Sequence, residues 1–125
     1  MKEKELQKRV NKFLSQIPGL WFYHPRETKK GTDGLPDIIG CFNGRFFAIE
    51  LKTPELKDAE KGLRPEQIKV INQIQNAKGK VLVTNDFEEV VKFIENFNNK
   101  GGINHVQVLA KPKKEKTKRR NQSSA

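Results

Sequence analysis

Two acidic residues and a lysine lie within otherwise apolar sequence in the segment LPDIIGCFNGRFFAIELKTP. The dipeptide Asn43-Gly44 between its two apolar runs is the strongest short-range signal for a two-residue type I′ hairpin turn. Counting outward from that turn, Asp37 lies opposite Glu50. Side chains alternate between the two faces of a strand, so Lys52 projects from the same face as Glu50. The hairpin therefore predicts two carboxylates about 5 Å apart, with a lysine beside them.

Like charges that face each other across a sheet are destabilising, so this pair of carboxylates calls for a cation between them. Hard cations such as Mg²⁺ take oxygen ligands, often one or two carboxylates together with water and substrate phosphate. A metal there can polarise a phosphoryl oxygen and make a bound water nucleophilic. Lys52 could orient or deprotonate that water, or neutralise charge in the transition state. The alternative is a surface hairpin in which Glu50 and Lys52 are only solvated and Asp37 caps a turn. The ExK triplet is common, but the full pattern is much rarer, so we favour the metal site.

The elements that must position these residues follow from periodicity and from turn and cap signals. The expected elements are a helix at 2–17, a strand at 20–24, the hairpin at 36–52, a helix from Pro65 to about Ala77 with Gly79 as its stop, a strand at 80–84, a helix from 87 to about 98 with Asp86 as its N-cap, and an edge strand at 103–109. The order α-β-β-β-α-β-α-β predicts an α/β (α+β) fold with a mixed central sheet flanked by helices.

The composition indicates one domain followed by a basic tail. A chain of 125 residues is long enough for one ordinary hydrophobic core. Its single cysteine excludes an internal disulfide and fits a reducing, cytoplasmic compartment. No apolar run approaches the roughly 20 residues of a membrane span, so no membrane segment is expected. Residues 111–125 hold seven Lys/Arg and one Glu, which is +6 of the net charge of +10. We expect a folded domain at 1–110 and a disordered tail at 111–125.

The stretches GLPDIIG and FFAIELKTP, preceded by KKGTDG, resemble the PD-(D/E)XK nuclease superfamily and, more narrowly, its VRR-NUC (virus-type replication-repair nuclease) domain. The resemblance covers about residues 3–95 and implies a restriction-endonuclease-like core. It also implies that Asp37 and Glu50 bind a divalent metal, Mg²⁺ with Mn²⁺ as substitute, and that the backbone carbonyl of Leu51 adds a ligand. Lys52 then corresponds to the catalytic lysine of the family.

Members of the family also have a glutamine on the helix after the hairpin and often an acid on the first helix. Gln67 matches the glutamine, and its amide could hydrogen-bond a catalytic water or a phosphate; the alternative is a plain polar helix residue. For the acid, Glu3 continues the apolar stripe toward the core, whereas Glu5 falls on the solvated face. We take Glu3 as the auxiliary acid of the site. The alternative is a solvated charge that suits the helix dipole.

Basic residues and one threonine near the hairpin, and basic residues in the tail, are candidates for contacts with a phosphate backbone, with plain solvation or a solubilising tail as the alternatives. These candidates are Lys29, Lys30, Thr32, Lys118, Arg119 and Arg120. Other conspicuous residues have simpler interpretations. The aromatic run Trp21–Tyr23 is expected to be strand core rather than a base-stacking platform, which is the alternative. Cys41 is expected to be a small core residue, and His24 an ordinary residue.

The favoured function is a Mg²⁺-dependent DNA endonuclease that acts in recombination or repair in a bacterium or a phage-infected cell. Stand-alone domains of this size resemble phage members thought to act as dimeric Holliday-junction resolvases, so branched DNA and a homodimer are expected. The alternatives are a nicking or flap nuclease and a catalytically inert DNA-binding module. The presence of all three residues Asp37, Glu50 and Lys52 argues against the inert module.

Overall fold

The computed structural model describes residues 2–26 and 34–97. These residues form helices α1 (Glu3–Ser15), α2 (Pro65–Asn76) and α3 (Phe87–Glu95), the 3₁₀ turn η1 (Ala59–Gly62), and strands β1 (Leu20–Tyr23), β2 (Ile38–Phe42), β3 (Arg45–Leu51) and β4 (Lys80–Thr84). The predicted strand at 103–109 and the predicted domain boundary at 110 lie outside the described residues. None of the helices between residues 2 and 97 that the structure describes has the length and apolar character needed to cross a membrane.

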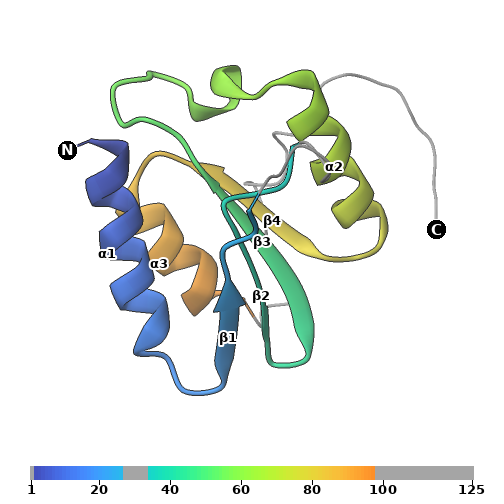
Figure 1. Ribbon diagram of the computed structural model, residues 1–125. Helices are drawn as coiled ribbons and strands as arrows, with labels where there is room; N and C mark the ends of the chain where they lie inside the picture. Colours follow the sequence, from blue (N-terminus) through green and yellow to red (C-terminus); the bar gives the residue numbers. More distant parts are fainter. Residues whose placement is uncertain (1, 27–33, 98–125) are drawn as a thin grey trace.

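The four strands form one mixed sheet in the order β1-β2-β3-β4. The strands from β1 to β3 pair antiparallel, and β3 pairs with β4 in parallel. Helices α1 and α3 cover one face of the sheet, and α2 covers part of the other (Figure 1). The predicted mixed sheet flanked by helices is therefore confirmed.

The turn between β2 and β3 fixes the register of the sheet. Asn43 and Gly44 both have positive φ, 54° and 78°, as a type I′ turn requires. The strands then pair with the register predicted from the sequence, out to Ile38 opposite Ile49. The ladder stops there, so Asp37 lies one residue before the start of β2 rather than within a strand pair.

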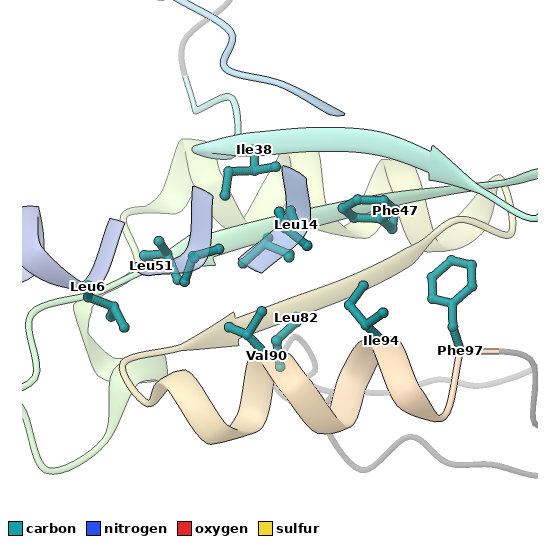
Figure 2. Close-up of a cluster of buried hydrophobic side chains, with 11 residues drawn as sticks. Leu6, Leu14, Ile38, Phe47, Leu51, Leu82, Val90, Ile94 and Phe97 are labelled. Atoms are coloured by element: carbon teal, nitrogen blue, oxygen red, sulfur yellow. The ribbon is translucent and has the colours of Figure 1, made fainter. Parts of the chain in front are cut away.

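Each face of β3 contacts a different set of helices. Phe47, Ile49 and Leu51 face α1 and α3, where their side chains join the larger hydrophobic core (Figure 2). Ala48 faces α2 and packs in a smaller cluster with Ile71. Strict alternation places Glu50 on the α2 face as well, so a carboxylate comes to lie at the end of a strand that is buried on both sides.

Strand β1 differs from the expectation that its aromatic residues are core. Leu20 and Phe22 do pack against the core, but Trp21 and Tyr23 are 59% and 54% exposed. The reason is that β1 is an edge strand and α2 packs over β3 and β4, so none of the helices described between residues 2 and 97 lies above the β1 part of this face. Cys41, which pairs with Trp21 on that same face, is also exposed. The prediction that Cys41 is a core residue was therefore wrong.

Helix α2 ends at Asn76, one residue before the predicted end at about Ala77. The left-handed residue is Lys78, with φ 75°, and the N–H groups of Lys78 and Gly79 bond back to the carbonyls of Gln75 and Ile74 as in a Schellman motif. Gly79 is required for a different reason: a Cβ there would lie 2.7 Å from Ile74 Cγ2. Helix α3 begins at the predicted Asp86 cap but ends at Glu95, three residues before the predicted end.

Lys78→Gly should stabilise the protein by about 1 kcal/mol, because glycine adopts a positive φ without the steric penalty of a side chain. The matched control is Lys69→Gly, the same exchange at an exposed position inside α2, which should destabilise by about 0.8 kcal/mol. Urea denaturation of both variants measures the difference. A loss of stability in Lys78→Gly would contradict the assigned helix end.

Candidate active site

Two hydrogen bonds tie Asp37 to Glu50 and Leu51 at the open end of the β2–β3 hairpin. The backbone N–H of Asp37 donates to Glu50 Oε1 at 3.1 Å. The backbone N–H of Leu51 donates to Asp37 Oδ2 at 2.8 Å. Each carboxylate thus binds the backbone of the other strand, and these bonds continue the hairpin where the regular ladder ends. The predicted proximity of the two acids is confirmed, through side chain–backbone bonds rather than a strand pair.

Gly34 helps to place Asp37 beside α2. It has a φ of 85°, and a Cβ on this residue would overlap the backbone carbonyl of Glu66 in the first turn of α2. Only glycine allows both the positive φ and such a close approach. The glycine three residues before Asp37 therefore sets how closely the acidic segment packs against the start of α2.

Glu50 is only 4% exposed, and its second oxygen also has partners. Oε2 accepts a hydrogen bond from Gln67 Nε2 at 2.8 Å and lies 3.2 Å from Lys52 Nζ. Burial and, after it, the negative charge of Asp37 raise the pKa of Glu50 to about 7, while the Lys52 ammonium opposes this shift. The site therefore holds one carboxylate that resists ionisation as long as no further cation is bound.

Gln67 connects the acids to the lysine. It lies in the first turn of α2, which begins at Pro65, and its Oε1 accepts from the backbone N–H of Arg64 at 2.9 Å and from Lys52 Nζ at 3.2 Å. Its amide therefore caps α2 and bridges Glu50 to Lys52. The sequence predicted that Gln67 belongs to the site and that its amide hydrogen-bonds a water or a phosphate. In the structure the amide instead hydrogen-bonds Glu50 and Lys52 and so holds their side chains in place.

The residues that are brought together fit a hard divalent cation. The carboxylates of Asp37 and Glu50 are held close together because each accepts a hydrogen bond from the backbone of the other segment, and their mutual repulsion is what such an ion would neutralise. Among residues 2–26 and 34–97, no group of three or more His, Cys, Asp or Glu side chains is arranged so that it could hold a metal ion. Two carboxylates are a donor set that Mg²⁺ commonly uses, because this ion keeps water or phosphate as its other ligands.

A pocket of about 530 Å³ opens beside Asp37. Its lining comes from α1, the end of β1, the segment before β2 and the start of α2: Gln7, Asn11, His24, Pro25, Leu35, Pro36, Asp37, Arg64 and Gln67. His24, which the sequence suggested was an ordinary residue, bonds through Nδ1 to the Asp37 carbonyl at 3.2 Å. The pocket is thus lined by one of the two acids, Asp37, and also by Arg64, whose guanidinium pairs with Glu66 at 2.6 Å.

Helix α1 contributes amides rather than an acid to this pocket. Gln7 and Asn11 are one turn apart and share a face of the helix, beside the apolar stripe. Glu3 is exposed in the first turn and does not line the pocket, and Glu5 accepts a hydrogen bond from the Lys2 backbone. The role expected for Glu3 stays a prediction. The sequence signal that was missed is this pair of amides, Gln7 and Asn11, spaced four residues apart beside the apolar stripe.

The residues proposed from the sequence to contact the phosphate backbone, which are Lys29, Lys30, Thr32, Lys118, Arg119 and Arg120, all lie outside the described residues. The structure therefore leaves those assignments as predictions.

Comparison with known proteins supports the fold. No protein-family model matches the sequence, and no curated protein matches it. A solved structure described as a VRR_NUC domain matches with a TM-score of 0.61 at 21% sequence identity, over 78% of this chain and 98% of that one. The chain therefore has the fold of that domain, in agreement with the fold that the PD and ExK motifs implied.

Asn11→Ala should separate stability from ligand binding. Asn11 lines the pocket, and its buried Oδ1 has no hydrogen-bond partner among the residues that the structure describes. Because an unsatisfied buried acceptor is destabilising, its removal should leave the free energy of unfolding unchanged or raise it by about 1 kcal/mol. Affinity for a ligand that fills the pocket should fall. Loss of stability without loss of affinity would make Asn11 a structural residue.

Asp37→Asn should stabilise the metal-free protein at high pH. Folding raises the pKa of Glu50 from 4.5 to about 7, so the folded state binds a proton that the unfolded chain has released. Stability should therefore fall as the pH rises from 4.5 to 7, by about 3 kcal/mol. Removing the Asp37 charge reverses part of this loss, so the variant should be more stable than wild type by about 1 kcal/mol at pH 8 and by less at pH 5.

Thermal melts in EDTA at the two pH values measure this difference. Asp58→Asn is the matched control, because Asp58 is an exposed N-cap of η1 and asparagine caps equally well. If Asp37→Asn were less stable than wild type at pH 8, the two carboxylates would not repel each other as described.

Proposed function

We propose that this chain is a metal-dependent DNA endonuclease of the VRR-NUC type within the PD-(D/E)XK superfamily. The observation that carries the proposal is the cluster in which Asp37, Glu50, Lys52 and Gln67 are connected by hydrogen bonds of 2.8–3.2 Å. It lies next to a pocket, in the fold of a VRR_NUC domain. The alternative of a solvated surface hairpin does not account for a 4% exposed Glu50.

The metal would be held by Asp37 and Glu50, with the Leu51 carbonyl as a further ligand. When bound, Mg²⁺ would polarise a phosphoryl oxygen and lower the pKa of a bound water. Neutralising the charge between the two acids would also allow Glu50 to ionise near neutral pH, because its pKa is raised partly by the Asp37 charge. The backbone hydrogen bonds to Asp37 and Glu50 hold the two acids close together before any ion binds.

Lys52 is held where it can act on the reacting phosphate or its water. Its Nζ donates to Gln67 Oε1 and pairs with Glu50, each at 3.2 Å, and its side chain is 15% exposed. Its aliphatic stem packs beside η1, where a Cβ on Gly62 would lie 3.3 Å from Lys52 Cδ. A fixed ammonium at this position stabilises negative charge that develops in phosphoryl transfer. Arg64 also lines the pocket, with its guanidinium paired to Glu66 at 2.6 Å.

Within this function we favour a structure-specific enzyme on branched DNA, of the Holliday-junction resolvase kind, acting as a homodimer in the cytoplasm of a bacterium or a phage-infected cell. Two copies would place one site on each of two strands. This proposal rests on the VRR-NUC resemblance, as does a role in recombination or repair. The alternatives are a nicking or flap nuclease and an inert DNA-binding module.

Cleavage of a panel of labelled DNAs tests the function: four-way junction, flap, nicked duplex, single strand and plain duplex. We expect cleavage with Mg²⁺ or Mn²⁺, binding without turnover with Ca²⁺, and no cleavage in EDTA. Lys52→Met should lower kcat by at least about 100-fold. Lys57→Met, at an exposed lysine five residues away, is the matched control and should leave kcat unchanged.

The outcomes separate the candidate functions. Symmetric paired cuts confined to the four-way junction, from a protein that light scattering shows to be a dimer, support the resolvase. Cuts only at flaps support the alternative nuclease. Binding to all probes without any cleavage supports the inert module, and cleavage in excess EDTA refutes the metal-dependent site.

A further inference from the structure

Two exposed aromatic rings of strand β1 lie parallel to each other on the face of the sheet that α2 packs against. The rings of Trp21 and Tyr23 have an interplanar angle of 2° and centroids 6.2 Å apart. Among the described residues, the large hydrophobic side chains that are exposed are these two and Phe46. We refer to the pair Trp21 and Tyr23 as the aromatic platform. Exposed apolar groups that cluster in this way are typical of a binding surface.

The aromatic platform lies on the same face of the sheet as the acidic pair. The register places Tyr23 beside Ile39 and Trp21 beside Cys41, and side chains two residues apart share a face. Asp37 is the next residue on this face beyond Ile39. One two-residue step along a strand is about 7 Å, so Tyr23 and Trp21 lie about 7 and 13 Å along the strand from the level of Asp37.

Strand β1 also connects the two features directly. His24 follows Tyr23 in sequence, and its Nδ1 bonds to the Asp37 carbonyl at 3.2 Å. His24 and Pro25 line the pocket beside the acids. Strand β1 is at the edge of the sheet (Figure 1), and α2 packs against β3 and β4 rather than against β1. A ligand that occupies the pocket can therefore continue along the strand onto the aromatic platform.

We propose that the aromatic platform stacks unpaired DNA bases that flank the scissile phosphate. The proposal rests on the proposed function in taking DNA as the ligand. Residues 1–110 carry a net charge of +4 and residues 111–125 a further +6, and this positive charge attracts a phosphate backbone. Flat aromatic rings stack on any base without regard to sequence. Bases inside a duplex are stacked on each other and cannot reach these rings. The preferred substrate class is therefore branched DNA in which bases next to the cut are unpaired or frayed at the branch point.

Trp21 is the only tryptophan of the chain, so its fluorescence reports directly on stacking. The experiment titrates full-length Asp37→Asn protein in EDTA with a thymidine oligonucleotide, and with an abasic oligonucleotide of the same length and charge. We expect the thymidine strand to quench the fluorescence and to bind at least about tenfold more tightly. The abasic strand should leave the fluorescence unchanged. Equal quenching by the two strands would overturn the proposal.

Substitutions of both rings provide a second measurement, by anisotropy of the labelled strands. Trp21→Thr with Tyr23→Thr keeps strand propensity and should abolish the preference for the thymidine strand. Trp21→Phe with Tyr23→Phe keeps flat rings and should retain most of it. Because both side chains are exposed, the threonine variant should melt within about 3 °C of wild type.

Other occupants of the aromatic platform predict different results. If a second copy of the chain covers it, the threonine variant should convert a dimer into a monomer while its affinity for the thymidine strand stays unchanged. If residues 98–125 cover it, the variant should melt well below wild type. Either result would overturn base stacking. Failure of the nuclease proposal would appear in the cleavage panel instead, because these binding measurements require no cleavage.

Discussion

The structure depends on holding two carboxylates together that would otherwise repel each other. Neither Asp37 nor Glu50 is left to solvent or to a counter-ion alone, since each accepts a hydrogen bond from the backbone of the opposite strand. Glu50 can remain buried only because Gln67 and Lys52 also satisfy its second oxygen. The hairpin, the parallel strand β4 and the first turn of α2 are the parts of the fold that keep these groups in place.

Much of this arrangement could be predicted from the sequence because it is encoded locally. Asn43-Gly44 specifies a turn with two positive φ angles, and strict alternation then carries the register outward to both acids. Pro65 and Asp86 mark helix starts through the missing N–H of proline and the capping carboxylate. The first helix could also be predicted from the spacing of its apolar residues, since Leu6, Val10 and Leu14 are fully buried.

The features that sequence reasoning missed depend on contacts between distant segments. An aromatic run such as Trp21–Tyr23 has the same sequence pattern whether or not a helix covers its outer face, and the coverage is decided by where α2 packs. The amides of Gln7 and Asn11 reach the pocket only because α1 lies beside the segment that carries Asp37. In the same way, the contact between Gln67 and Glu50 joins residues 17 positions apart. No local spacing rule encodes such a contact.

The alternation along β3 also constrains how this protein can diverge during evolution. Glu50 is the sixth residue after Gly44, and because side chains alternate along the strand, this spacing directs Glu50 toward α2 and Leu51 toward the larger core on the opposite face. Inserting or deleting one residue in this stretch would turn Glu50 to the opposite face, placing its carboxylate in the larger core and an apolar side chain, Ile49 or Leu51, at the site. Homologous sequences should therefore show length variation in the polar connection at 53–58 and not between the turn and the glutamate.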